Sequence, residues 1–158
     1  MNQISRILPP SNVVLDLEVT SKKRVFEQVG LLFENNHGIA RSVVFDSLFS
    51  RERLGSTGLG HGVAVPHGRI KGLNEAVAAF VRLAQPINFE APDSKPVNLM
   101  VILLVPEQAT QQHLEILAEL AQMLSSKTLR DELSIEPSAS TVHSLLTHWE
   151  PTQLDATA

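Results

Sequence analysis

The residues best suited to chemistry gather in one basic, glycine-rich stretch between residues 50 and 74. His67 follows Pro66 there, and an imidazole with an ordinary pKa of about 6.5 can act as a neutral nucleophile at cellular pH. In a chain of net charge −4, this stretch holds one acid, Glu52, and four cations: Arg51, Arg53, Arg69 and Lys71. Glycine N–H groups and guanidinium forks suit a phosphoryl group, so we expect an anion site. The alternative is a solvated basic surface around a structural loop.

A second histidine, His113, lies in the first turn of a predicted helix that follows Thr110. It shares an apolar stripe with Leu117, Leu120 and Leu124, which turns it towards the sheet. Such a histidine is more often a hydrogen-bonded structural residue than an active one. If the strands before His67 and His113 run parallel, however, the two rings converge where ligand crevices form in α/β sheets. The positive end of the helix would also favour a bound anion.

Several other kinds of chemistry are excluded by what the sequence lacks. The glycine stretch 55–62 has neither a G-x-G-x-x-G spacing nor the lysine of a Walker loop, and no G-x-S-x-G elbow occurs. The histidines form no H-E-x-x-H motif, and His61 and His67 have no standard metal-ligand spacing. Cysteine is absent, which removes disulfides, thiolate nucleophiles and cysteine-bound zinc. We therefore expect no metal and no cofactor.

The composition is that of one globular domain, with 158 residues, 43% hydrophobic and 19% charged. With 13 basic against 17 acidic side chains, nothing suggests nucleic-acid binding. The start of the chain lacks a secretory pattern, and the longest apolar run, 97–105, is much shorter than the roughly 20 residues that span a bilayer. We expect a cytoplasmic protein with no membrane insertion.

Periodicity along the chain predicts interleaved helices and strands, and hence an α/β fold with one sheet. After an irregular start, helices are expected from Thr20 or Ser21 to Asn36 or Gly38, from Ala40 or Ser42 to about residue 53, and from Thr110 onward. Shorter helices are expected at 127–133 and 140–149. Strands are expected at 63–65, 76–83 and 97–105, the last buried on both faces because its apolar run is continuous. The stretches 55–62 and 85–96 are expected to be loops.

Two segments carry a resemblance to a known family. Residues 51–68, RERLGSTGLGHGVAVPHG, resemble the active segment of the fructose/mannitol-type enzyme IIA domains of the bacterial phosphoenolpyruvate phosphotransferase system. The segment from Leu103 to Pro106, followed by His113, Leu114 and Leu117, is similar to the second-histidine motif of that family. The resemblance covers residues 5–148 as one domain and leaves 149–158 as a flexible tail. It implies a single mixed sheet of about five strands flanked by helices.

The resemblance also implies roles for three residues. His67 would accept a phosphoryl group from a phosphocarrier protein and become a phosphohistidine. His113 would orient the site and contact the phosphoryl oxygens, and Arg51 would neutralise their charge. Gly68 is compatible with crowding at this site. No role follows for His61, which we expect to be exposed.

The length and the Gly-Ser-Thr-Gly string are most similar to the nitrogen-type enzyme IIA, a regulatory phosphoprotein that binds partners according to its phosphorylation state. Two alternatives stay open. A sugar-specific enzyme IIA would pass the phosphoryl group to a permease, and a non-covalent anion-binding module would need only the arginines and glycines. His37, His143 and His148 are interpreted as structural or surface residues.

Overall fold

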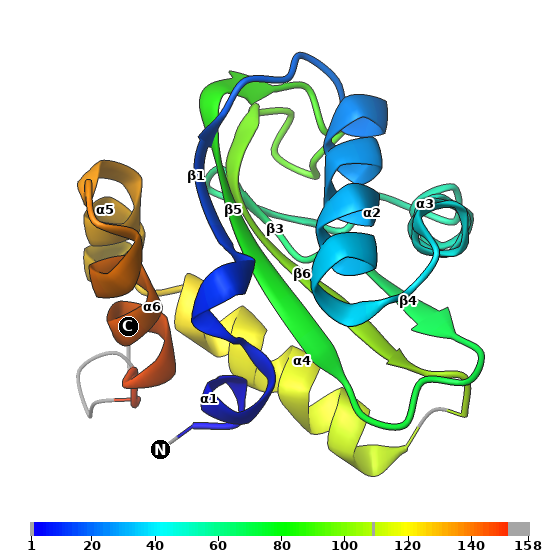
Figure 1. Ribbon diagram of the computed structural model, residues 1–158. Helices are drawn as coiled ribbons and strands as arrows, with labels where there is room; N and C mark the ends of the chain where they lie inside the picture. The colour runs from blue at the N-terminus through cyan, green and yellow to red at the C-terminus, as the bar shows by residue number, and fades with distance from the viewer. Residues whose placement is uncertain (1, 109, 152–158) are drawn as a thin grey trace.

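The computed structural model describes residues 2–108 and 110–151. Helices cover both faces of a central sheet, so the fold has three layers (Figure 1). The helices are α1 (Ile4–Ile7), the 3-10 turn η1 (Pro10–Asn12), α2 (Lys22–His37), α3 (Arg41–Glu52), α4 (Gln111–Leu124), α5 (Lys127–Ile135) and α6 (Ala139–Thr147). The strands are β1 (Val13–Leu17), β2 (Gly58–Gly60), β3 (Val63–Ala64), β4 (His67–Ile70), β5 (Val77–Ile87) and β6 (Val97–Pro106).

The sheet has six strands in the order β1-β5-β6-β3-β2, with β4 also paired to β6. Both β3 and β4 run parallel to β6 and are separated by Val65 and Pro66, so they fill one position beside it. Strand β5 runs antiparallel to β6, and β1 runs parallel to β5. The predicted single mixed sheet is therefore confirmed. It has six strands where about five were expected, because β3 and β4 share one position.

Strand β6 carries core side chains on both faces. Three of them, Met100, Ile102 and Leu104, join the apolar cluster beneath α2 and α3. The alternate ones, Leu99, Val101 and Leu103, pack with α4, α5 and α6. All six are at most 2% exposed, which confirms the burial on both faces predicted from the continuous apolar run.

The predicted helix ends follow from their capping residues. Ser21 Oγ accepts the Arg24 N–H at 3.2 Å where α2 begins, and Gly38 ends this helix with a left-handed φ of 69°. Helix α3 begins after Ala40 and α4 after Thr110, as expected. The two short C-terminal helices are also present.

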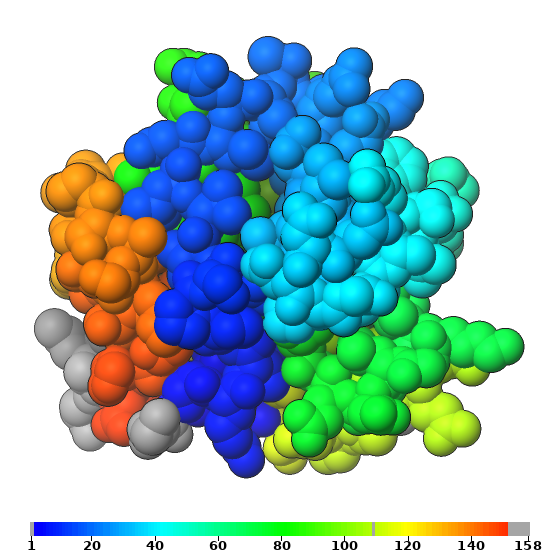
Figure 2. All heavy atoms as spheres, in the orientation of Figure 1, coloured from blue at the N-terminus to red at the C-terminus, as the bar shows by residue number. Residues whose placement is uncertain are grey.

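The N-terminal segment differs from the irregular start that was expected, because it forms α1, η1 and β1. The side chains of β1 are mostly half-buried, so its sequence lacks the alternation by which a strand is predicted. Asn12 is fully buried and its Nδ2 donates to the Ala78 carbonyl at 2.9 Å, which ties the start of β1 to β5. Figure 2 shows this segment packed between the C-terminal helices and the layer of α2 and α3.

Hydrogen bonds connect the two ends of the described chain. Asn2 Nδ2 donates to the carbonyls of Leu146 and Trp149 at 2.8 and 2.9 Å, which satisfies groups at the end of α6. Trp149 is partly buried against the core. Most of the predicted tail, residues 152–158, lies outside the described residues, and the domain limits 5–148 stay a prediction. No helix in the described ranges is both long and apolar enough to cross a membrane.

The glycine stretch expected to be a loop contains strand β2 and a tight hairpin. Gly60 pairs with Val63, so His61 and Gly62 form a two-residue turn, and both have positive φ, 58° and 81°. Such values match a type I′ turn, in which glycine and a few polar residues are favoured. Asp93 accepts the N–H of His61 at 3.0 Å and braces the turn. His61 is exposed, as predicted.

Candidate functional site

A cavity of about 640 Å³ opens where the sheet ends at β4, and it brings His67, Arg51 and His113 together. Among the described strands β4 pairs only with β6, so its outer side is a sheet edge. Helix α3 approaches this edge from one face and α4 from the other (Figure 1). The remaining lining residues are Asp46, Ser47, Ser50, Leu54, Gly68, Arg69, Leu103, Val105, Leu114 and Leu117.

His67 is the first residue of β4, which corrects the expectation that it lies in a loop beyond a strand. It pairs with Leu103 of β6, whose side chain belongs to the cluster on the α4 face. Alternation turns Gly68 to the opposite face, where an added Cβ would lie 3.1 Å from backbone and Cβ atoms of Ser47 in α3. Helix α3 therefore crowds Gly68, and the half-buried imidazole of His67 is left on the side of α4.

The tautomer of His67 is set by its hydrogen bond to Val65. The ring Nδ1 lies 2.9 Å from the Val65 carbonyl oxygen, which can only accept, so Nδ1 carries the proton. The Nε2 lone pair makes no hydrogen bond within the described residues and is not sealed in the interior. Burial lowers the pKa of His67 and the charge of Arg51 acts the same way, whereas the Val65 hydrogen bond and the charge of Glu52 oppose them. The ring is therefore neutral at pH 7, with a nucleophilic nitrogen free.

His113 has the opposite tautomer. It is 8% exposed in the first turn of α4, and its Nδ1 accepts the Thr110 N–H at 3.2 Å. This bond resembles half of a capping box, with a histidine in place of the usual glutamate. The neutral ring must then carry its proton on Nε2. His113 thus has a structural bond at one nitrogen and a donor available at the other.

Arg51 lies in the last turn of α3 and is half-buried. Its Nη1 donates to the Gly55 carbonyl at 2.8 Å, which fixes the guanidinium against the turn that follows the helix. No carboxylate pairs with it among the residues that the structure describes. Since a guanidinium has five N–H donors, several stay available for an anion.

The positive charge of the stretch 50–74 is less concentrated in the structure than the sequence indicates. Arg51 and Arg69 line the cavity, together with the acid Asp46, whereas Arg53 and Lys71 do not. The one acid of the stretch, Glu52, is paired with Lys22 at 3.0 Å and faces the interior. The cavity itself therefore has a small positive charge from two arginines and one aspartate.

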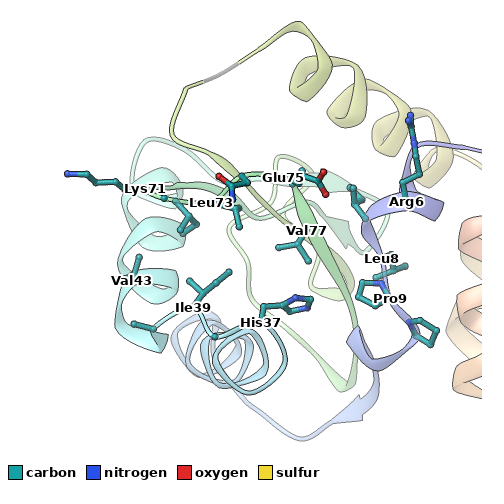
Figure 3. Close-up of a pocket in the computed structure, with 18 of the residues that line it drawn as sticks. Arg6, Leu8, Pro9, His37, Ile39, Val43, Lys71, Leu73, Glu75 and Val77 are labelled. Carbon is teal, nitrogen blue, oxygen red and sulfur yellow. The ribbon is translucent and has the colours of Figure 1, made fainter.

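Two further histidines line a different cavity of about 990 Å³, bounded by α1, the link between α2 and α3, and the turn after β4 (Figure 3). His37 Nε2 accepts from Asn12 Nδ2 at 2.8 Å, and His143 Nε2 donates to the Leu8 carbonyl at 2.8 Å. In Figure 3 the ring of His37 lies between Ile39 and Pro9. These bonds agree with the structural interpretation of both rings. No cluster of three or more metal-ligating side chains occurs in residues 2–108 and 110–151.

Comparison with known proteins assigns the chain to a family. Residues 6–149 match the family described as "Phosphoenolpyruvate-dependent sugar phosphotransferase system, EIIA 2". The chain belongs to this EIIA family. The nitrogen regulatory protein of Pseudomonas aeruginosa is 38% identical over 92% of this EIIA chain and 96% of its own length. That of Escherichia coli K12 is 36% identical over 98% and 95%.

A solved structure supports the same assignment for this EIIA chain. The crystal structure of nitrogen regulatory protein IIA-Ntr from Neisseria meningitidis is 53% identical and superposes with a TM-score of 0.88. The match covers 92% of this chain and 100% of that one. The predicted resemblance to the nitrogen-type enzyme IIA is therefore confirmed.

Glu52, which the sequence shows only as one acid among basic residues, is buried next to Arg51 and outside the cavity lining. The signal was available, because Glu52 continues the stripe of Val44 and Leu48 at four-residue spacing. A carboxylate on a buried helical stripe predicts a buried partner. That partner, Lys22, is 30 residues away in the sequence, so only the fold could identify it.

Proposed function

We propose that this chain is a cytoplasmic regulatory phosphoprotein of a nitrogen-type phosphotransferase system, phosphorylated on His67 by a phosphocarrier protein. The observation that carries the proposal is the free Nε2 of a neutral His67, facing a cavity that Arg51 and His113 also line. Nucleophile, cation and N–H donor come from three separate elements. Phosphoryl transfer depends mainly on such positioning and on charge stabilisation.

The transfer balances without any proton leaving the site. The Nε2 lone pair of His67 attacks the phosphorus, and the P–N bond to the carrier's phosphohistidine breaks, returning its electron pair to the carrier ring. The proton on Nδ1 stays at the Val65 carbonyl, which stabilises the positive charge of the phosphorylated ring. Arg51 and the Nε2–H of His113 donate to the phosphoryl oxygens, helped by the N-terminus of α4.

A protein donor fits the rim of this cavity. Leu54 and Leu114 both line it, and they are 85% and 60% exposed. Exposed leucines beside a polar centre are typical of protein contact sites. We infer that the phosphocarrier docks on these leucines while its phosphohistidine reaches His67.

The regulatory part of the proposal is supported by the relatives, which are named nitrogen regulatory proteins. Because no proton leaves, phosphorylation adds one net negative charge, from a doubly negative phosphoryl group on a positively charged ring. At a cavity lined by two arginines and Asp46, that change cancels the small positive charge. Partners docking over the cavity can therefore distinguish the two states. Whether the component counts as an enzyme depends on onward transfer, since its phosphohistidine is then an intermediate.

The proposal is tested by intact-mass measurement after incubation with phosphoenolpyruvate and the upstream carrier proteins at neutral pH. One acid-labile phosphoryl adduct is expected, absent from His67→Gln and kept by the matched control His61→Gln. An adduct that persists in His67→Gln would contradict the choice of nucleophile. No adduct on the unaltered protein would favour the non-covalent anion-binding module. Onward transfer to sugar, when permease domains are added, would favour the sugar-specific enzyme IIA.

A further inference from the structure

Glu52 is a buried carboxylate to which neither the family match nor the proposed chemistry assigns a part. Its side chain is 3% exposed at the end of α3. It accepts hydrogen bonds from the N–H and the Oγ1 of Thr57, at 3.0 and 2.7 Å, and from Lys22 Nζ at 3.0 Å. The carboxylate thus joins α2, α3 and the start of the glycine hairpin at one point.

The buried ion pair of Lys22 and Glu52 is not explained by a gain in folding stability alone. Lys22 is 14% exposed and its Nζ lies 4.3 Å from the centre of the Phe89 ring. Buried ion pairs contribute little net stability compared with apolar residues of similar size, because both charges lose water. A role in fixing geometry therefore accounts better for the pair than stability does.

A continuous path of hydrogen bonds leads from Glu52 to His67. Thr57 donates its N–H to the carboxylate and accepts the Val65 N–H at its carbonyl, at 3.1 Å. The Val65 carbonyl in turn accepts the Nδ1–H of His67 at 2.9 Å. The peptide groups along this path are joined through the Cα atoms of Thr57 and Val65, so the path fixes the position of the Val65 carbonyl. The negative charge of Glu52 acts on the ring directly and raises the pKa of His67.

The same carboxylate also holds the turn that anchors Arg51. The bonds between Glu52 and Thr57 close a short loop that contains Gly55, whose carbonyl accepts from Arg51 Nη1. Loss of these bonds would loosen the loop and the guanidinium, because only the backbone bonds from Leu54 to Arg51 and from Gly55 to Glu52 would still hold the turn. The Glu52 side chain is therefore connected to His67 through Thr57 and Val65, and to Arg51 through the turn that contains Gly55.

We propose that Glu52 is a positioning residue of the phosphoryl site, holding His67 through Thr57 and Val65 and Arg51 through the closed turn. The inference rests on the proposed function of His67. It predicts that the negative charge of Glu52 stabilises the ring that carries a proton on Nδ1, both before transfer and in the phosphorylated state.

The test compares Glu52→Gln with Glu34→Gln, a control whose carboxylate pairs with Arg41 on the surface at 2.7 Å. ¹⁵N NMR titration of the histidine rings should show a lower pKa and less Nδ1–H tautomer for His67 in Glu52→Gln, with no change in the control. Phosphoryl acceptance should slow by about 10–100-fold, the range measured for outer-shell groups that orient the histidine ligands of metal sites. A folded Glu52→Gln protein with unchanged His67 titration and rate would overturn the proposal.

A second variant covers the case in which Glu52→Gln alone fails to fold. The double variant Glu52→Gln with Lys22→Met removes both charges and keeps similar volumes, a type of exchange that buried ion pairs tolerate. The same downward change at His67 is expected, and its absence would again overturn the proposal. Because the titration needs no phosphoryl donor, it still tests Glu52 if the unaltered protein accepts no phosphate. Only the proposed function fails in that case.

Discussion

At the scale of single residues, backbone groups hold two imidazole rings in opposite tautomers on one cavity. The Val65 carbonyl keeps the proton of His67 on Nδ1, and the Thr110 N–H leaves the proton of His113 on Nε2. One ring therefore offers a lone pair and the other a donor at neutral pH. Since neither ring has to exchange a proton first, both are prepared for an incoming phosphoryl group.

The pH dependence of phosphoryl acceptance follows from the lowered pKa of His67. The neutral ring persists below the usual value of about 6.5, so the rate should be constant above it and fall only at lower pH. The unfolded chain binds this proton more readily, so the stability contributed by the neutral ring is also lost as the pH falls below about 6.5. Single-turnover rates and ring titration measure both effects. A rate that already declines above pH 6.5 would contradict the assignment.

The rate of phosphoryl acceptance should depend on the planar shape of the Arg51 guanidinium as well as on its charge. Arg51→Lys keeps the charge but loses the planar fork and its bond to Gly55, so acceptance should be impaired. Arg51→Ala should lose about 10²–10³ in rate, the usual effect of removing one group that stabilises developing charge. Rapid-quench kinetics with the phosphocarrier measures this. Arg53→Ala, on an exposed residue that does not line the cavity, is the control, and equal rates for all variants would make Arg51 a surface residue.

At the scale of elements, the site depends on how three segments end or begin. Helix α3 ends beside the sheet edge and delivers Arg51, while β4 begins there with His67 after the break at Pro66. Helix α4 starts at the same edge and presents His113 from its first turn. The parallel pairing of β4 with β6 is what brings the two histidines to one cavity.

His113 combines a cap and a donor, and two variants can separate them. His113→Ala should destabilise α4 by about 1 kcal/mol through the lost hydrogen bond, and should slow acceptance without abolishing it. His113→Gln should recover stability, because glutamine at this position completes a capping box, but should not recover the rate. Thermal unfolding and transfer kinetics on the same samples provide the comparison. Full recovery of both properties would reduce His113 to a structural residue.

Much of the fold could be predicted because its long helices and strands have clear sequence signals, either capping residues or a regular pattern of apolar residues. Helix α2 shows its caps at Ser21 and Gly38, and β6 shows its burial as an unbroken apolar run. Strands β1, β2 and β4 were not predicted, since the first is half-buried, the second is largely glycine and the third is only four residues long. Strand β1 is paired by β5, which is distant in the sequence, whereas β2 pairs with the adjacent β3 across the turn at His61 and Gly62.

The candidate site was predicted to a similar extent. His67, Arg51 and His113 do line one cavity, but their individual roles stay predictions that the experiments above test. The bond between Lys22 and Glu52 could not be predicted, because nothing local relates α2 to the end of α3. The turn at His61 carried a signal, since His-Gly occupies the place of the Asn-Gly pair common in type I′ turns.

At the scale of the whole molecule, the cavity lies on an edge of the sheet, open to other proteins. Two exposed leucines, Leu54 just after α3 and Leu114 near the start of α4, give this edge an apolar rim. Arg69 is exposed on the same edge. A partner that covers the edge would contact the rim and His67 together, so its affinity would depend on the phosphorylation that we propose for His67.

Phosphorylation should therefore change the affinity of a partner that docks through acidic side chains. The unmodified form should bind more tightly, by roughly 5–150-fold on the usual scale of such coupling, because the phosphoryl group cancels the positive charge of Arg51 and Arg69. The difference should shrink with added salt if the contacts are exposed. Calorimetric titration of a co-purifying partner at two salt concentrations measures it. Equal affinities would make the histidine only a transfer site for that partner.

The bonds from Asn2 to Leu146 and Trp149 bring the beginning and the end of the domain together. Proteins with adjacent termini tolerate circular permutation, and exposed turns are the usual places to open them. Linking residue 151 to residue 2 and opening the chain between Asn74 and Glu75, both exposed, should preserve the fold. The new termini would then leave from the turn between β4 and β5. A reporter domain fused there could report the docking of a partner without disturbing the hydrogen bonds of Asn2 to Leu146 and Trp149.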